Sequence, residues 1–137
     1  MADQIQFELV SPERLLVSEP VEMVVVPGAE GDFGVLPGHA PLVSTVRPGV
    51  IAVFEGNKVT QRIFVAGGFA EVTGERCTVL AEQAMPVTAI DRAAAEDEIR
   101  NARDDLAEAK DDAERARMEA RIAAGEAKLA ALDTPVY

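Results

Sequence analysis

Residues 27–42 read PGAEGDFGVLPGHAPL, and this stretch separates the first strand-like segments of the chain from the later ones. Glycine or proline occupies seven of its sixteen positions, while Phe33, Val35 and Leu36 supply apolar anchors. Compact surface loops that are packed by their own side chains have this composition and often carry function, so we expect such a loop here. A tight strand connection, in which glycines take positive φ angles, is an equally weighted alternative.

The same stretch does not fit a phosphate-binding loop, because it has no lysine, no predicted helix follows it, and Glu30 and Asp32 would repel an anion. His39 is the only histidine. We expect it to lock the loop through a hydrogen bond, since neither a nucleophile–His–acid pattern nor a cluster of metal ligands accompanies it. We therefore predict no catalytic residue, no metal site and no cofactor.

Short strands are expected on both sides of this stretch. Ile5, Phe7 and Leu9 alternate with polar residues, as in a half-buried strand, and 21–26 is rich in β-branched residues. Two hairpins are predicted, with turns at Gly56-Asn57 and Gly74-Glu75. Many short strands with frequent turns favour an antiparallel β-sandwich or a flattened barrel.

The composition changes near residue 88. Residues 1–88 hold nine of the ten glycines and seven of the eight prolines, whereas residues 89–137 hold fifteen alanines. This change predicts a β-domain over 1–87 and a helical segment over 88–137. Thr88 and Asp91 resemble the two ends of a capping box, which would start the first helix.

The helical segment is expected to fold as an antiparallel hairpin. Its best break lies at 110–112, where Asp111 would cap a second helix with Glu114 at the third position. The helices would then cover about 90–109 and 112–132. Small or apolar residues form one heptad-like seam at Ile99, Ala102, Leu106, Ala109, Ala113, Ala116, Ala120, Ala123, Ala127 and Ala130, with a second at Met118, Ile122, Gly125, Leu129 and Leu132.

Charge and composition exclude several functions. The chain has 137 residues, 24 acidic and 13 basic side chains, and a formal net charge of -11. Such an acidic chain is a poor binder of nucleic acid or of an anionic membrane surface. The single cysteine, Cys77, precludes an internal disulfide. No signal-peptide pattern or membrane-length apolar run is found, so we expect a cytoplasm-like compartment without direct bilayer insertion.

Three segments together carry a resemblance to a known family. They are 27–42 with Arg47-Pro48-Gly49, then Val65-Ala66-Gly67-Gly68-Phe69-Ala70-Glu71-Val72, and then Val79-Leu80-Ala81-Glu82. The chain resembles the epsilon subunits of bacterial F-type ATP synthases, which are similar to the mitochondrial delta subunit. The resemblance covers essentially the whole length and implies an N-terminal antiparallel β-sandwich followed by a C-terminal α-helical hairpin.

The resemblance also implies a function. It suggests a non-catalytic subunit of the central stalk, or rotor, which links the gamma subunit to the c-ring during proton-driven ATP synthesis. The complex would be peripheral on the cytoplasmic face of the bacterial inner membrane. The c-ring contact of the family matches Gly31, Asp32, Phe33 and Gly34. Pro37, Gly38, His39 and Pro41 match its loop-structuring residues.

The hairpin of such subunits can also reach the alpha and beta subunits of the catalytic head, and in some members it binds ATP through an Ile/Leu-Asp-x-x-Arg-Ala motif. Ile90, Asp91 and Ala95 match this motif, but Ala94 stands in place of its arginine. Without that guanidinium we expect no ATP binding. The net charge is -5 over 89–137 and -6 over 1–88, so we expect at most weak regulation of ATP hydrolysis. The alternative function is a free β-sandwich adaptor that binds a partner coiled coil through its Ala-rich hairpin.

Overall fold

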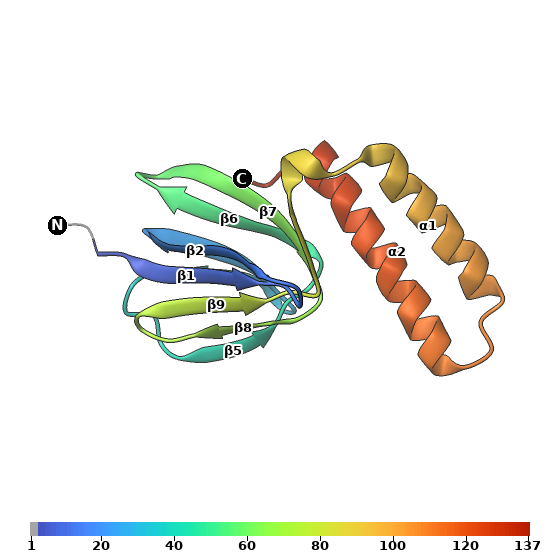
Figure 1. The fold of residues 1–137 in the computed structure, drawn as a ribbon, viewed down its shortest axis with the longest axis horizontal. Helices are drawn as coiled ribbons and strands as arrows, with labels where there is room; N and C mark the ends of the chain where they lie inside the picture. The colour runs from blue at the N-terminus through green and yellow to red at the C-terminus, as the bar shows by residue number, and fades with distance from the viewer. Residues whose placement is uncertain (1–2) are drawn as a thin grey trace. The chain divides into compact units, whose positions relative to one another are not determined.

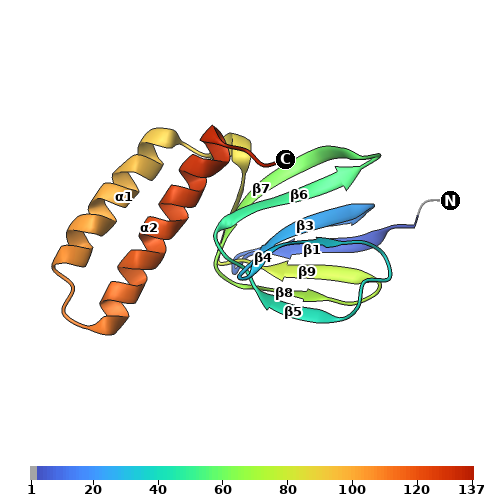
Figure 2. The ribbon, with the colours of Figure 1, turned by 180° about the vertical axis from the view of Figure 1, so that it is seen from behind.

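The structure is a computed structural model that describes residues 3–137, and the chain separates into two compact units. The first unit extends to Pro86 and also includes Tyr137, the last residue of the sequence. The second unit is Val87–Val136. Figures 1 and 2 show strands in the first unit and a pair of helices in the second.

The first unit contains two five-stranded sheets. The first sheet has the order β2-β1-β9-β8-β5, and its strands are β2 (Leu15–Val21), β1 (Ile5–Val10), β9 (Arg76–Leu80), β8 (Phe69–Val72) and β5 (Leu42–Thr45). The second sheet has the order β10-β7-β6-β3-β4, and its strands are β10 (Gln83–Pro86), β7 (Lys58–Ala66), β6 (Gly49–Glu55), β3 (Met23–Gly28) and β4 (Gly31–Val35). We call them the first and the second sheet below.

The predicted β-sandwich is confirmed, with one difference in strand direction. β1 and β9 are parallel, with Phe7 opposite Cys77 and Leu9 opposite Val79, whereas the other strand pairs of the described residues are antiparallel. The chain therefore inserts its first strand between β2 and a strand that is made much later. Local alternation cannot reveal this pairing, because it reports which face is buried and not which strand is the neighbour.

The core lies between the two sheets and follows the predicted alternation. Ile5, Phe7 and Leu9 point inward from β1 and are fully buried. Val24 and Val26 of β3 and several residues of the later strands complete the cluster: Ile51, Val53, Val65, Ala70, Val72, Cys77 and Val79. Because successive side chains in a strand point to opposite faces, the residues between these form the two outer faces of the sandwich.

Both predicted hairpin turns are present. Gly56 and Asn57 have φ angles of 57° and 65°, as a two-residue turn between twisted strands requires, and they connect β6 to β7. Gly74 and Glu75 lie between β8 and β9.

The compact loop expected over 27–41 is wrong in its first half. Residues Gly31–Val35 form β4, which pairs with β3 so that Asp32 lies opposite Pro27 and Gly31 opposite Gly28. The alternative of a tight strand connection was the better interpretation, since only Ala29 and Glu30 separate the two strands. Strands β2 and β10 were not predicted, because an exposed edge strand such as β2 carries little alternation.

The second unit contains a short 3-10 helix, Val87–Ala89, followed by α1 (Arg92–Ala107) and α2 (Asp112–Asp133). The predicted break is confirmed, because the Asp111 side chain caps α2 by accepting from the Glu114 backbone N–H at 2.8 Å. The predicted capping box at Thr88 is wrong. Asp91 itself caps α1 by accepting from the Ala94 N–H at 3.1 Å.

The packing of the helices follows different seams in the two halves. Ala95, Ile99 and Ala102 are buried in α1, as the first seam predicts for the latter two, whereas the buried residues of α2 are Gly125 and Lys128. The continuation of the first seam through Ala113, Ala116, Ala120, Ala123 and Ala130 is exposed. The turn at 108–111 resets the helical phase, so one seam cannot serve both helices.

Candidate functional site

The Asp32 side chain has both carboxylate oxygens engaged. One Arg47 nitrogen donates to Oδ1 at 2.5 Å, and the Tyr137 hydroxyl donates to Oδ2 at 2.8 Å. Arg47 also donates to the Gly28 carbonyl oxygen at 2.5 Å, which fixes its guanidinium against the start of the β3–β4 connection. Asp32 is therefore not a free acidic group, although its side chain is about 29% exposed.

Tyr137 lies on the outer face of the second sheet. Besides its bond to Asp32, its carbonyl oxygen accepts from Arg62 Nε at 2.8 Å, and its ring meets the Phe54 ring edge-on with centroids 5.9 Å apart. Partial burial and the Asp32 carboxylate raise the pKa of the Tyr137 phenol, because both disfavour the phenolate. No signal in the sequence pointed to Tyr137.

The loop residues Pro37, Gly38, His39 and Pro41 follow β4. Gly38 has a φ angle of 84°, and its N–H donates to the Gly74 carbonyl oxygen at 2.8 Å. The His39 N–H donates to the Leu36 carbonyl oxygen at 3.1 Å, and the His39 Nδ1 lies 2.6 Å from the Ala40 carbonyl oxygen. The His39 bond closes a turn within the loop, and the Gly38 bond ties the loop to the turn at Gly74. Both bonds stabilise the loop conformation.

The two sheets meet at the end of the sandwich that holds Asp32. Gly28 of β3 forms an isolated bridge with Val46, and the Val46 N–H donates to the Gly68 carbonyl oxygen at 3.1 Å. Gly68 has a φ angle of 99°, and a Cβ there would lie 1.7 Å from the Leu80 carbonyl oxygen. Only glycine allows this close approach.

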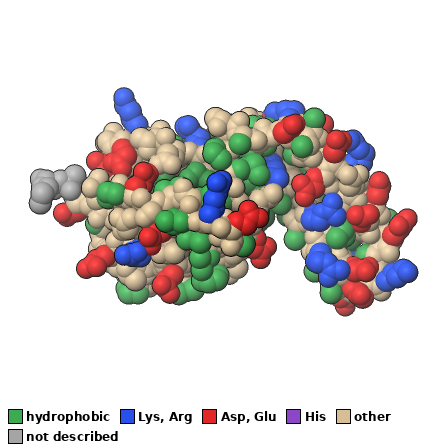
Figure 3. Space-filling model, viewed as in Figure 1, with side chains coloured by type: hydrophobic (Ala, Val, Ile, Leu, Met, Phe, Trp, Pro, Cys, Tyr) green, Lys and Arg blue, Asp and Glu red, His purple; other side chains and the backbone are tan. Residues whose placement is uncertain are grey.

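An apolar row crosses the outer face of the first sheet at the same end. The strand register places Phe69 opposite Leu80, Leu80 opposite Val10, and Val10 opposite Leu15. Leu15, Phe69 and Leu80 are 55%, 45% and 38% exposed. Figure 3 shows hydrophobic side chains gathered on the sandwich near the ends to which β1 and β9 run. We call Leu15, Val10, Leu80 and Phe69 the apolar row.

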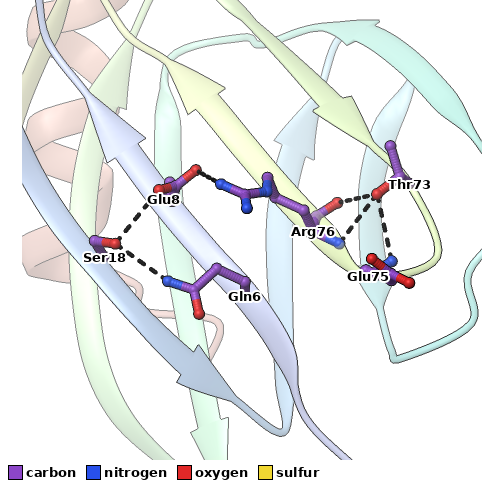
Figure 4. A network of polar contacts seen from close by, with 6 residues as sticks. All are labelled: Gln6, Glu8, Ser18, Thr73, Glu75 and Arg76. Atoms are coloured by element: carbon purple, nitrogen blue, oxygen red, sulfur yellow. Dashed lines mark hydrogen bonds and ion pairs between the residues drawn. The ribbon is translucent and has the colours of Figure 1, made fainter.

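A polar network borders the row on this face, which also carries the exposed Val43 of β5 (Figure 4). Glu8 of β1 forms an ion pair with Arg76 of β9. Ser18 of β2 donates to Glu8 at 3.4 Å and accepts from Gln6 at 3.1 Å. The apolar row is thus bordered by paired polar side chains, which is typical of a protein-binding surface with a polar rim.

The residues that match the nucleotide motif lie at the start of α1. The Asp91 side chain caps α1 by accepting from the Ala94 N–H. Ala95 is 2% exposed and faces α2, and Ile90 is half-buried. A close approach dominates this region, since a Cβ at Gly125 would lie 2.5 Å from Ile99 Cγ1. Arg92, the arginine nearest in sequence to Ala94, bonds Asp133 of α2.

Charged side chains join the two helices of the second unit. Glu98 of α1 lies 3.8 Å from Lys128 Nζ and 3.9 Å from Arg121 Nε, and Arg121 also contacts Asp105 at 3.3 Å. Within the helices, Arg100 bonds Asp97 and Arg115 bonds Asp112, both as i,i+3 pairs.

Catalytic chemistry finds little support. Within residues 3–137, no group of three or more His, Cys, Asp or Glu side chains is placed to hold a metal ion. Cys77 is fully buried, and burial raises its pKa to about 12, so its thiol is not a nucleophile near neutral pH. None of the described helices is long and apolar enough to cross a membrane.

Two family models match the chain. Residues 4–87 match the β-sandwich domain of the ATP synthase delta/epsilon chain, and residues 91–136 match the C-terminal domain of the ATP synthase epsilon chain. Both matches follow the order of the two structural units.

Individual relatives agree. The ATP synthase epsilon chain of Rhodospirillum rubrum is 63% identical over 102 residues, covering 74% of this chain and 76% of the relative. That of Rhodospirillum centenum is 64% identical over 108 residues, covering 75% of this chain and 74% of the relative. A chain in the Euglena gracilis mitochondrial ATP synthase structure (OSCP/F1/c-ring) is 30% identical with a TM-score of 0.78, covering 94% of this chain and 81% of that one. The chain therefore belongs to the family of ATP synthase epsilon subunits.

Proposed function

We propose that this chain is a non-catalytic subunit of the ATP synthase central stalk, which links the gamma subunit to the c-ring. The proposal rests on the family match over both units and on the Euglena relative, whose structure includes F1 and the c-ring. In this proposal residues 1–87 dock on the rotor, and residues 88–137 form the hairpin. The complex is peripheral to the cytoplasmic face of the bacterial inner membrane. The free adaptor is not favoured by these comparisons.

The apolar row is the proposed docking surface for gamma. It is the one cross-strand run of exposed large side chains that the strand register joins among the described residues. Burial of such a row removes apolar area from water, at about 25 cal/mol per Å². The bordering Glu8–Arg76 pair adds specificity more than affinity, because exposed ion pairs are weak.

Replacing Leu80 tests this surface. Capture of the tagged full chain from detergent-solubilised membranes should recover gamma and the catalytic head in stoichiometric amounts. Leu80→Asp should reduce this recovery at least tenfold, because it places a charge in the centre of the row. Thr78→Asp, on the same face and strand, is the matched control and should lower recovery far less. Equal recovery by both variants would remove the row from the gamma contact.

The segment Gly31–Gly34 of β4 is the proposed contact with the c-ring. It lies at the edge of the second sheet, since β4 is the last strand in its order, and it carries the Asp32 carboxylate. Asp32→Arg reverses the charge at this position and replaces the ion pair with Arg47 by a repulsion between two guanidinium groups. Proton pumping in inverted vesicles should therefore fall relative to ATP hydrolysis. Glu30→Arg tests whether any charge reversal in this connection has the same effect. Normal pumping by the Asp32 variant would remove Asp32 from the interface.

The hairpin is proposed to regulate ATP hydrolysis weakly. Arg121 and Lys128 are paired with acids of the neighbouring helix, Arg100 and Arg115 with acids of their own helix, and the unit is acidic overall. Contacts with the alpha and beta subunits of the head would therefore compete with internal ion pairs. Deletion of residues 89–137 should leave assembly intact and change the ATPase rate less than twofold. A strong activation of hydrolysis would overturn this part.

A further inference from the structure

We propose that the outer face of the second sheet carries a binding site for the Tyr137 side chain, and that this site overlaps the segment of β4 that meets the c-ring. The first part rests on the geometry alone. The second rests on the proposed function, because it takes Gly31–Gly34 of β4 as the c-ring contact.

The site is built from three strands that are separate in sequence. Asp32 of β4 accepts a hydrogen bond from the Tyr137 hydroxyl, Phe54 of β6 packs edge-on against the ring, and Arg62 of β7 donates to the Tyr137 backbone carbonyl. The three contacts address three different parts of one residue: its hydroxyl, its ring and its main chain. A phenylalanine would satisfy two of them and lose the one that involves Asp32.

Arg47 completes the site without touching Tyr137. Its guanidinium binds the other oxygen of Asp32 and the Gly28 carbonyl oxygen, so the carboxylate is held in one orientation with Oδ2 turned to the phenol. A carboxylate between a guanidinium and a phenol has its strongest acceptor positions filled. A donor on the c-ring that approaches Oδ2 would therefore compete with the Tyr137 hydroxyl.

The overlap makes Tyr137 a competitor for Asp32. While the phenol is bound, Arg47 pairs with one oxygen of the Asp32 carboxylate and the Tyr137 hydroxyl donates to the other. Removing only the hydroxyl leaves the Phe54 contact but uncovers Oδ2. Tyr137→Phe should thus strengthen c-ring binding about three- to tenfold, the range expected for one hydrogen bond to a charged acceptor that is partly exposed.

The sequence makes the first test selective, because Tyr137 is the only tyrosine and there is no tryptophan. Ultraviolet absorbance of the full chain during alkaline titration therefore follows one phenol. Its pKa should lie above the ordinary value of about 10 and fall in Asp32→Ala, though only in part, because burial also raises it. Glu30→Gln, an acid in the same connection, is the matched control and should leave the titration unchanged. A wild-type phenol with an ordinary pKa, or one insensitive to Asp32→Ala, overturns the site.

The second test reports on the overlap. Replacement of Tyr137 by 3-fluorotyrosine gives one fluorine resonance, which is recorded for the free chain, for the Asp32→Ala variant and for the chain assembled with gamma and the c-ring. In the assembly the resonance should move to the position of the Asp32→Ala variant. An unmoved resonance in an assembly that contains the ring overturns the overlap and leaves the proposed function intact. Failure of the chain to join any assembly overturns the proposed function, while the titration still decides the Tyr137 site.

Discussion

Different interactions stabilise the sandwich and the hairpin, each within itself. The sandwich buries Phe7, Ile5, Leu9 and a set of valines completely, and each such side chain contributes about 1.5–3 kcal/mol. The hairpin buries mainly alanine and glycine around Ile99, and ion pairs such as Lys128–Glu98 supplement this small core. The stability of the sandwich is therefore sensitive to substitutions at its close contacts, whereas the stability of the hairpin depends on the distance between its two helices.

The largest effect is expected at the junction of the sheets. Gly68→Ala should destabilise the sandwich by about 3 kcal/mol or more, because its Cβ would collide with the Leu80 backbone and φ is positive. Denaturant unfolding of the full chain measures this. Gly38→Ala is the control, since its φ is also positive but nothing lies within 4 Å of the new Cβ. That variant should lose about 1–2 kcal/mol; equal losses would show that the close contact at Gly68 is unimportant.

The free energy of unfolding of the sandwich should also depend on alkaline pH through Cys77. The folded Cys77 thiol keeps its proton up to about pH 12, whereas an unfolded thiol loses it near pH 9. Between these values the unfolded state binds fewer protons, so the free energy of unfolding falls as pH rises, by about 1.4 kcal/mol per pH unit. Comparing the pH slopes of wild type and Cys77→Ala isolates this contribution from other titrating groups. Parallel slopes would mean that the thiol ionises equally in both states.

A smaller effect is expected where the helices approach each other. Gly125→Ala places a methyl group against Ile99, which costs about 1–3 kcal/mol, while alanine returns about 1 kcal/mol of helix propensity. The hairpin should therefore lose about 1 kcal/mol, seen as an earlier helical unfolding transition by circular dichroism. Adding Ile99→Ala should relieve the clash, so the two changes should be non-additive. Additive losses would argue against direct contact.

The smallest effect is expected at the open end of the hairpin, where α1 begins and α2 ends. Arg92 forms a two-point ion pair with Asp133, and this hydrogen-bonded contact lowers the Asp133 pKa. A depressed carboxyl pKa stabilises the fold at neutral pH and loses that contribution as pH falls through it. Both side chains are exposed, so Asp133→Asn should reduce helical stability only slightly at pH 7, and not at all at high salt. Asp104→Asn, an exposed acid of α1, serves as the control.

Local patterns predicted the parts of the fold that local chemistry determines. The alternation in β1, the turn at Gly56-Asn57 and the Asp111 cap all depend on neighbours in sequence, and all three were correct. The pairing of β1 with β9 was missed because it depends on distant residues. The first predicted seam fails in α2 because the turn before it has no helical period, whereas the second predicted seam correctly places Gly125 on the packed side.

The candidate site shows the same division. Asp32 and His39 were selected from the sequence through the glycine-rich stretch and the family resemblance. The contacts around them were not, because Arg47, Phe54, Arg62 and Tyr137 come together only when β4, β6 and β7 belong to one sheet, in which β3 lies between β4 and β6. The apolar row was equally hidden, since Phe69, Leu80 and Leu15 belong to three strands and become neighbours only through their register.

The parallel pairing of β1 with β9 also has a consequence for synthesis of the protein. As the chain leaves the ribosome, β1 and β2 can form a hairpin at once, but the other edge of β1 stays open until residues 76–80 emerge. An open apolar edge is a site of aggregation, and such non-local pairing is slow. Truncated chains that stop before residue 76 should therefore need chaperones to stay in solution, whereas chains that extend through β10 should not.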